Sequence, residues 1–241
     1  MQKTLSQNQI EAFYHDNFVA EQVEHFTALF RPDDHKTIVD VGGGCGFFAE
    51  GLKFRTGWTV RVLDSNKDSV AICRAKGLDA AVDDALAPHI RGDEDVVCFN
   101  LILHHLVGPD EAATLVLQER ALAAWHARAS AVFVNEYIYD SYVSTFSGRL
   151  IYAITSSKLL SALASAVSRV VPSLRANTFG VGVRFRAHDE WVRIFESLGF
   201  KVAGVVRGAE EGVSPARRLL LIRSCRRDSF LLEPVFAAVP V

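Results

Sequence analysis

The chain has 241 residues, of which 49% are hydrophobic and 22% are charged, and its formal net charge is −2. These values are typical of an ordinary core-forming protein, and the length predicts one large domain rather than two small ones. The near-neutral charge and the absence of a stripe of basic and aromatic residues argue against a nucleic-acid partner. The opening residues, "MQKTLSQNQIEAF", lack the apolar run of a signal peptide, so we expect a cytoplasmic protein.

Four cysteines are spread along the chain, with neither paired spacing nor a neighbouring histidine cluster: Cys45, Cys73, Cys98 and Cys225. Zinc sites and disulfide-stapled folds need such clustering. We therefore expect no metal site and no disulfide, and we expect the four thiols to be small, buried and unreactive.

The two parts of the chain differ in charge. Residues 1–140 carry 12 basic and 21 acidic side chains, whereas residues 141–241 carry 14 basic and 7 acidic ones. The arginine-rich second part is either a set of scattered surface charges or a surface that meets an anionic ligand.

Between residue 36 and about residue 137, short β-rich runs alternate with helical stretches. Continuous apolar strands separated by helices of about 10–20 residues are the pattern of a parallel sheet covered on both faces. One or two helices are expected ahead of the sheet. We predict strands at 36–42, 59–64, 78–82, 95–103 and 130–138, and helices at 46–56, 66–76 and 109–126.

Beyond residue 141 this alternation pauses. We predict a helix over 146–172, a helix over 188–200, and two final antiparallel strands at 201–207 and 217–223. The first of these helices is too polar to span a membrane. Its serines share one face, which we expect to meet solvent, and its leucines and valines share the other. A lid over a substrate pocket and a helix lying on a membrane surface are the alternative interpretations.

No repeat, low-complexity tract or linker separates a second domain. The single domain then consists of N-terminal lid helices (1–30), a cofactor-binding core (36–140), a helical insertion or lid (141–186), the last helix and strands (187–224) and a tail (225–241).

Residues 39–48, "VDVGGGCGFF", place three spaced glycines between a strand and a helix. Because Gly42, Gly44 and Gly46 have no Cβ, the backbone can turn sharply there and let a ligand touch its amides. A dinucleotide fingerprint needs a further glycine at position 47, which is Phe, and a phosphate-binding Walker loop needs a following lysine. The pattern therefore disfavours both kinds of phosphate site.

Acidic residues lie near these glycines and after the neighbouring strands. Asp64 ends the second strand, where its carboxylate can accept hydrogen bonds from ribose hydroxyls or cap the next helix. Asp84 follows the third strand and can accept from an exocyclic amine, beside the amide of Ala85, or it forms a turn. Asp40 precedes the glycines and can receive loop amides or the amine of a cationic ligand.

Five segments, in this order and at these intervals, closely resemble the class I S-adenosylmethionine-dependent methyltransferases: "IVDVGGGCGFFAEGL", "VRVLDSN", "VDDALAP", "DVVCFNLILHHLVG" and "SAVFVNEY". The resemblance covers about residues 36–137 and 186–205. It implies an α/β fold with a seven-stranded Rossmann-like sheet of order 3-2-1-4-5-7-6, strand 7 antiparallel, helices on both faces and a helical lid.

The same resemblance implies S-adenosyl-L-methionine as the cofactor. The glycines then pass under its methionine part, Asp64 holds the ribose and Asp84 holds the adenine. Asn100 lines the reacting end, and Tyr14 lies in a segment that folds over the cofactor in many relatives. The residues assigned to the cofactor are Asp40, Gly42, Gly44, Gly46, Asp64, Ser65, Asp84, Ala85, Asn100 and Tyr14.

Two histidines, in "LILHHL", are the candidate catalytic residues. This segment resembles the "ILHDW" segment of small-molecule O-methyltransferases, whose histidine acts as a base and matches His104, with His105 as the second candidate. The alternative is a structural histidine at the strand end. Glu136 faces the acceptor, orients His104 or is a buried carboxylate, and Arg184 and Arg186 are placed to hold an anionic acceptor.

We therefore expect methyl transfer to a small-molecule acceptor, most readily at oxygen. The alternatives are methylation of RNA or protein, and a non-catalytic partner subunit that binds the cofactor. The sequence predicts no membrane-spanning segment, it is compatible with a monomer or a homodimer, and it does not identify the acceptor.

Overall fold

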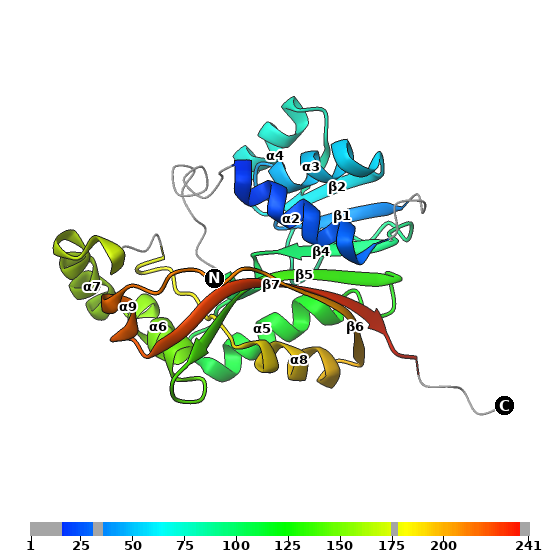
Figure 1. The fold of residues 1–241 in the computed structure, drawn as a ribbon. Coiled ribbons are helices and arrows are strands. Elements are labelled where there is room, and N and C mark those ends of the chain that lie inside the picture. The colour runs from blue at the N-terminus through cyan, green and yellow to red at the C-terminus, as the bar shows by residue number, and fades with distance from the viewer. Residues whose placement is uncertain (1–15, 31–35, 175–177, 237–241) are drawn as a thin grey trace.

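The computed structural model describes residues 16–30, 36–174 and 178–236. Its strands are β1 (Thr37–Val41), β2 (Thr59–Asp64), β3 (Asp79–Val82), β4 (Val96–Asn100), β5 (Ala131–Ser141), β6 (Phe200–Arg207) and β7 (Ile222–Pro234). They form one sheet in the order β3-β2-β1-β4-β5-β7-β6, in which β7 alone runs antiparallel to its neighbours (Figure 1). The predicted strand order and the predicted direction of the seventh strand are confirmed.

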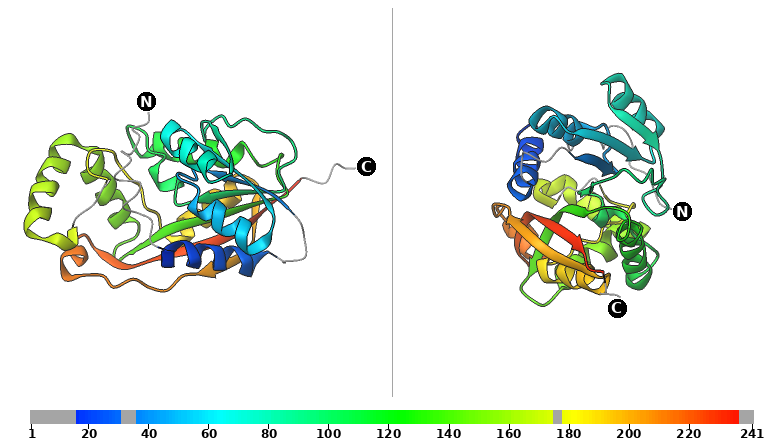
Figure 2. Two further views of the ribbon diagram at one scale, coloured as in Figure 1. Left: turned by 90° about the horizontal axis from the view of Figure 1, so that it is seen from above. Right: turned by 90° about the vertical axis from the view of Figure 1, so that its right-hand side faces the viewer.

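Helices cover both faces of this sheet. The helical elements are α2 (Asp16–Leu29), α3 (Phe47–Thr56), α4 (Lys67–Ala75), η1 (Leu103–His105), α5 (Glu111–Ala123), α6 (Phe146–Ser156), α7 (Lys158–Val170), η2 (Pro172–Leu174), α8 (His188–Ser197) and α9 (Pro215–Arg218). Helices α2, α3 and α4 lie on one side of the sheet and α5 and α8 on the other (Figures 1 and 2). The result is a three-layer architecture, as expected when both faces of a parallel sheet are buried.

Each face has its own hydrophobic core. On the α2–α4 side, Phe26 and Phe48 pack against Phe133 of the sheet, with ring centroids 5.1 and 6.1 Å away. On the other side, Trp125 and Trp191 are fully buried in a second cluster. Since neighbouring strand residues point to opposite faces, both cores draw on the same continuous apolar strands.

The chain order reverses between β1 and β4, because β2 and β3 extend the sheet on one side and β4 and β5 on the other. Ligands of open α/β sheets bind outside the carboxyl ends of the strands at such a point. The loops that follow β1, β2, β3 and β4 therefore mark the place where a functional site is expected.

Helices α6 and α7, η2 and α9 form a lobe beyond the carboxyl end of β5, at the left of Figure 1. One continuous helix was predicted over 146–172, but α6 and α7 meet at an angle of 100°. Ser157 has an extended backbone (φ −80°, ψ 126°), ends α6, and caps α7 by accepting a hydrogen bond from the N–H of Leu160. Among the described residues no single helix is long and apolar enough to cross a membrane, and α6 and α7 pass that test only as a bent pair.

The last strand differs from its prediction. The apolar run at 217–223 was expected to be a strand, but Ser214 caps the short helix α9 there and Leu221 then turns with a φ of 58°. Strand β7 begins only at Ile222 and includes most of the predicted tail. The prediction failed because β7 has charged side chains, Arg226 and Asp228 among them, whose ion pairs lie inside the fold and leave no alternating pattern.

Two smaller predictions are corrected or confirmed at the level of single residues. Strand β4 ends at Asn100 rather than at residue 103, because Leu101 adopts a φ of 56° and donates its N–H to the carbonyl of Asn135. All four cysteines are free and buried, as predicted.

Candidate active site

The glycine loop after β1 uses a backbone that other residues rarely adopt. Gly42, Gly44 and Gly46 have φ values of 70°, 53° and 75°, in the left-handed region that glycine adopts without strain. A Cβ at Gly42 would lie 1.8 Å from Cδ1 of Ile102, in the turn after β4. The loop and that turn are therefore in direct contact, and a side chain at Gly42 would separate them.

Asp40 lies directly beneath this loop and is fully buried. A Cβ at Gly43 would lie 2.3 Å from its Oδ2, yet neither carboxylate oxygen has a hydrogen-bond partner among the described residues. Burial, helped by the charge of Asp64, raises the pKa of Asp40 to about 7. The loop amides that were one predicted partner do not bond it, so Asp40 is a buried acceptor that lacks a donor.

Asp64, at the end of β2, is held by the backbone on both sides. Its Oδ2 accepts the N–H of Gly44 at 2.9 Å, and its Oδ1 accepts the N–H of Asn66 at 2.8 Å. Asp64 does not cap the next helix, because Asn66 caps α4. Burial raises the pKa of Asp64, and the two backbone bonds oppose that shift. A carboxylate has about four acceptor positions, so Asp64 is oriented by the loop and can still accept hydroxyl groups.

The turn after β3 brings the third acidic residue to the same edge. The N–H of Asp83 donates to the backbone carbonyl of Asp64, which fixes the turn beside β2. Asp84 is exposed, and its Oδ1 accepts the N–H of Leu86, so it also has the turn role that was the alternative. Ser65 is exposed and Ala85 is half-buried at this edge. Their assignment to a cofactor remains a prediction.

Asn100 lies at the end of β4, across the switch point from the glycine loop. Its Oδ1 is buried and has no hydrogen-bond partner among the described residues. The carboxyl ends of β1 and β4 thus bring together the unpartnered oxygens of Asp40 and Asn100. Buried polar groups without partners are rare, so this edge suits a polar ligand. Tyr14, the remaining predicted cofactor residue, lies outside the described residues.

His104 and Glu136 form a buried pair just beyond this edge. His104 Nδ1 lies 2.6 Å from Glu136 Oε2, and both side chains are nearly inaccessible to solvent. Glu136 Oε1 accepts the N–H of Leu103 at 2.7 Å, which fixes the carboxylate. Since an ionised carboxylate only accepts, Nδ1 carries the hydrogen and Nε2 of His104 is left as an acceptor. This is the geometry of a histidine oriented for proton transfer.

His105 has a different environment. Burial, together with the nearby His104, lowers the pKa of His105 well below its ordinary value, and its Nδ1 has no partner in the part of the chain that the structure describes. The two imidazole rings lie 4.2 Å apart, and the Phe185 ring lies 5.0 Å from that of His104. Tyr137 adds an edge-on contact with His104 at 6.1 Å. Of the two histidines, His104 alone has a carboxylate partner.

Arg184 and Arg186 hold the turn that carries His104. Arg184 forms ion pairs with Glu111 and Glu190 at 2.8 and 2.9 Å, and its N–H donates to the carbonyl of His104. Arg186 donates to Gln118, and Gln118 in turn donates to the carbonyl of Leu103. Both guanidinium groups are buried. These contacts give both arginines a positioning role, while Nη2 of Arg186 is buried without a partner among the described residues, so the predicted role in anion binding stays a prediction. Phe185, between them, is a residue that the sequence pattern did not indicate.

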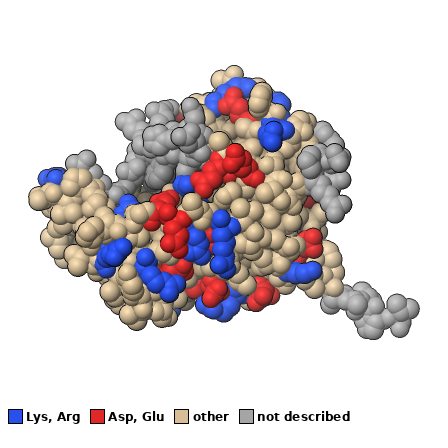
Figure 3. All heavy atoms as spheres, viewed as in Figure 1, with Lys and Arg blue, Asp and Glu red and all other residues tan. Residues whose placement is uncertain are grey.

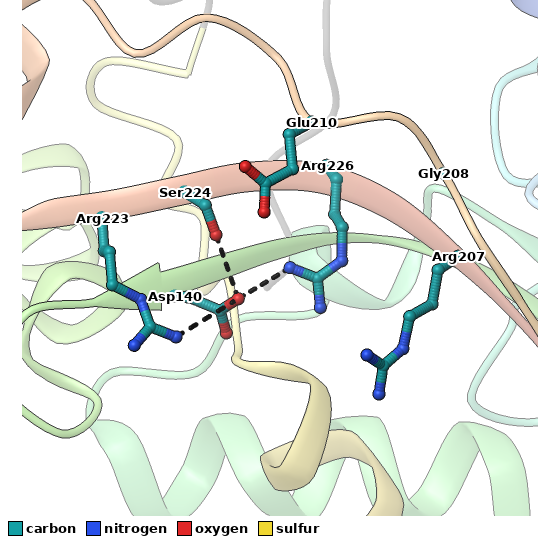
Figure 4. Close-up of a pocket in the computed structure, with 7 residues that line it drawn as sticks. All are labelled: Asp140, Arg207, Gly208, Glu210, Arg223, Ser224 and Arg226. Atoms are coloured by element: carbon teal, nitrogen blue, oxygen red, sulfur yellow. Dashed lines mark hydrogen bonds and ion pairs between the residues drawn. The ribbon is translucent and has the colours of Figure 1, made fainter.

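A separate pocket of about 500 Å³ lies where β5 and β6 end and β7 begins (Figure 4). Its charged groups largely pair with one another, since Asp140 accepts from Arg226 at 2.7 Å and from Ser224 at 3.1 Å. It contains none of the predicted site residues, so we assign it no role.

Among the described residues, no group of three or more potential metal ligands lies together.

No protein-family model matches the sequence, and no curated protein matches it. Solved structures do. The chain is similar to the [4+2]-cyclase SpnF, with a TM-score of 0.59 and 13% identity over 92% of this chain and 82% of that one. It is similar to magnesium protoporphyrin IX methyltransferase ChlM from Synechocystis PCC 6803 with bound SAM, with a TM-score of 0.55 and 11% identity over 97% and 86%.

A third similar structure is the mitomycin 7-O-methyltransferase MmcR, with a TM-score of 0.56 and 16% identity over 90% of this chain. The match covers 54% of MmcR, so this chain spans about half of its length. Together with the strand order, these similarities show that the chain has the class I methyltransferase fold.

Proposed function

We propose that this protein is an S-adenosylmethionine-dependent methyltransferase that acts on a small molecule, most readily at a hydroxyl oxygen. The observation that carries the proposal is the buried His104–Glu136 pair, which leaves Nε2 as an acceptor. His104 lies two residues beyond Ile102, whose side chain packs against Gly42. The turn that carries the proposed proton acceptor therefore contacts the glycine loop at the switch point of the sheet, where ligands of this architecture bind.

The residues at the sheet edge fit the cofactor. The glycine loop lets a ligand approach the backbone, and Asp64 keeps acceptor positions for ribose hydroxyls. The carboxylate of Asp40, which has no partner within residues 16–30, 36–174 and 178–236, would accept the cationic amine, and Oδ1 of Asn100 would accept a further donor. When bound, S-adenosylmethionine supplies a methyl group on a sulfonium that is its own good leaving group, so the protein mainly has to orient and exclude water.

His104 would move the proton in this reaction. The acceptor hydroxyl donates its proton to Nε2 and keeps the electron pair on oxygen, while Nδ1–H stays bonded to Glu136. The Glu136 carboxylate then stabilises the imidazolium that forms. Such general-base catalysis contributes about 10²–10⁴-fold in rate, and alignment of the reacting groups can contribute on the order of 7–11 kcal/mol.

The surroundings of His104 support a small and partly apolar acceptor. Phe185 and Tyr137 lie against its ring, and the Tyr139 ring stacks on Phe185 at 4.3 Å. Arg184 and Arg186 are engaged by carboxylates and an amide, and Nη2 of Arg186 is the guanidinium nitrogen that has no partner among the described residues. Aromatic side chains of this kind form apolar walls and stack on planar ligands.

Cofactor binding and methyl transfer need separate tests, because one structure with this fold is a [4+2]-cyclase. Calorimetric titration with S-adenosylmethionine, its demethylated product and NAD tests binding. We expect micromolar affinity for the first two, no affinity for NAD, and loss of binding in Asp64→Ala. Asp68→Ala is the matched control, because Asp68 is an exposed carboxylate on the adjacent helix α4. Binding of NAD alone would overturn the proposal.

Transfer is tested with a labelled methyl group and a panel of phenolic and aliphatic hydroxyl compounds. Label in a small molecule, and none in RNA or protein, is the expected result. If the cofactor binds but no compound or macromolecule becomes labelled, the protein is a cofactor-binding subunit or catalyses another reaction.

A further inference from the structure

Helix α7 packs on the protein through its polar face. Ser161 is buried, donates its hydroxyl to the carbonyls of Ile154 and Thr155, and accepts the N–H of Gly180 at 2.8 Å. Ser168, on the same face, is also buried. The expectation that the serine face meets solvent is therefore wrong, and the helix is inverted relative to an ordinary surface helix.

The opposite face of α7 is apolar and points outward. Leu159, Leu163 and Val170 are 79%, 62% and 83% exposed, and Leu160 and Val167 are exposed beside them. At 100° per residue these five side chains fall within an arc of about 120°. Four more exposed apolar side chains lie on or next to the lobe: Tyr142, Val143, Phe146 and Leu219. Together with the five on α7 they make nine of the fifteen large apolar side chains that are exposed among the described residues. Concentration of this kind marks an interaction surface.

The charges around this face have one sign. Between Phe146 and Val170, the span of α6 and α7, the sequence has three basic residues, Arg149, Lys158 and Arg169, and no acidic residue. Lys158 and Arg169 are exposed and eleven positions apart, which places both on the same border of the apolar arc. Arg149 is exposed on α6. Figure 3 shows the lobe at its left, where most of the surface is uncharged (tan) and lysine or arginine side chains (blue) lie among it.

We propose that the outer face of α7 is a docking surface for an anionic lipid bilayer, on which the helix lies in the plane of the headgroups. Leucine and valine side chains that insert at the headgroup boundary, bordered by cations that reach lipid phosphates, are the chemistry of interfacial helices. Long basic side chains keep their apolar stems on the hydrocarbon and their charges in the headgroups. A second copy of the chain fits less well with its α7 antiparallel, because a two-fold axis perpendicular to the helices would bring these cations against each other.

Flotation with phospholipid vesicles tests the docking surface. We expect the protein to bind vesicles of phosphatidylcholine mixed with phosphatidylglycerol, to bind pure phosphatidylcholine weakly, and to lose binding as salt rises. The variant L159S/L163S/V170S should lose about tenfold or more in partitioning. K158Q/R169Q should lose about fivefold per cation on the anionic vesicles only.

Phe54→Ser is the matched control. Phe54 is 93% exposed on α3, with exposed Lys53 and Arg55 beside it, but α3 lies away from α7 (Figure 1). It should leave partitioning unchanged. The substituted side chains are all exposed, so each variant should keep its melting temperature and its affinity for S-adenosylmethionine. These two readouts separate failure of docking from failure of the proposed function. If the triple variant melts lower, Leu159→Ser alone serves instead.

Three results would overturn the docking surface. The first is that the parent protein does not float with anionic vesicles. The second is that Phe54→Ser loses as much binding as the α7 variants. The third is a dimer in sedimentation equilibrium that the triple variant abolishes, since a second copy would then cover the face.

Discussion

The sheet edge and the α6–α7 lobe are incomplete in opposite ways. At the sheet edge the apolar side chains are packed, and the buried oxygens of Asp40 and Asn100 lack donors. In α7 the inward hydroxyls of Ser161 and Ser168 are bonded, and the apolar side chains face outward. Buried oxygens without partners suit a small molecule with matching donors, whereas an exposed apolar face suits contact with another surface. The comparison predicts two independent functions, and variants in one region should spare the other.

His104→Ala should give the largest effect and should be confined to the sheet edge. With an acceptor that supports turnover, we expect kcat to fall by about 10²–10⁴-fold, because the variant lacks the imidazole nitrogen that takes the proton. Glu136→Gln should cause a smaller fall, since it weakens orientation and removes the charge that stabilises the imidazolium. Steady-state kinetics measures both. Vesicle binding should stay unchanged in both variants. An unchanged kcat in both variants would remove the proton-transfer role.

Asp40→Asn should stabilise the protein at high pH and weaken cofactor binding. The pKa of Asp40 is raised to about 7 in the folded protein, against 3.8 as the ordinary value. Between these two pH values the unfolded chain has lost the proton that the folded chain keeps, so stability falls as pH rises. At about 1.4 kcal/mol per unit of pKa difference, ionised Asp40 lowers the free energy of unfolding by up to about 4 kcal/mol above pH 7.

In the asparagine variant this position does not ionise, so it causes no such loss of stability. Urea unfolding should show the variant and the parent equally stable below pH 4, and the variant more stable at pH 8. Cofactor affinity should strengthen with pH through about 7 in the parent and become flat in the variant, because only an ionised Asp40 attracts the amine. Equal pH dependence of stability in both proteins would show that Asp40 has a partner at this edge after all.

Gly42→Ala tests whether the loop needs its close contact or only its conformation. The new Cβ would lie 1.8 Å from Ile102 and carry the strain of a φ of 70°. Gly57→Ala is the matched control, since Gly57 has a φ of 71° and a Cβ there meets nothing within 4 Å. The control should cost about 1 kcal/mol of stability and keep cofactor affinity. Gly42→Ala should also lose roughly a hundredfold in affinity, about 2.7 kcal/mol. Equal affinity in the two variants would assign the glycines to conformation alone.

The sequence predicted the sheet edge well because its signals are local. Apolar runs, spaced glycines and polar residues at the strand ends placed Gly42, Asp64 and Asn100 at one edge of the sheet. The His104–Glu136 pair was one of the alternatives, and only the fold decides it, because it joins residues from β5 and η1. Burial of Arg184 and Arg186 was not predictable, since their partners lie on α5 and α8, up to 75 residues away.

The lobe shows the corresponding limit for helices. Periodicity gave two faces of one helix, but it does not say which face turns inward. The bend at Ser157 folds α7 back on the loop around Gly180, and the hydrogen bonds of Ser161 then decide the orientation. An amphipathic pattern has no information about such a neighbour.

Ser161→Ala should give the smallest effect and tests what holds α7 in this orientation. The Ser161 hydroxyl bonds two carbonyls at the end of α6 and the N–H of Gly180, and its removal leaves that N–H without its side-chain acceptor. We expect a loss of about 1–2 kcal/mol, expressed locally as faster amide hydrogen exchange in α7. Ser165→Ala, four positions along on a half-exposed part of the same helix, should change exchange by less than about 0.5 kcal/mol. Cofactor affinity should stay at the parent value in both, because neither serine approaches the sheet edge. If Ser161→Ala leaves exchange in α7 unchanged, packing of the helix ends rather than the serine face holds the helix. If it instead lowers cofactor affinity, the lobe is coupled to the sheet edge and acts as a lid.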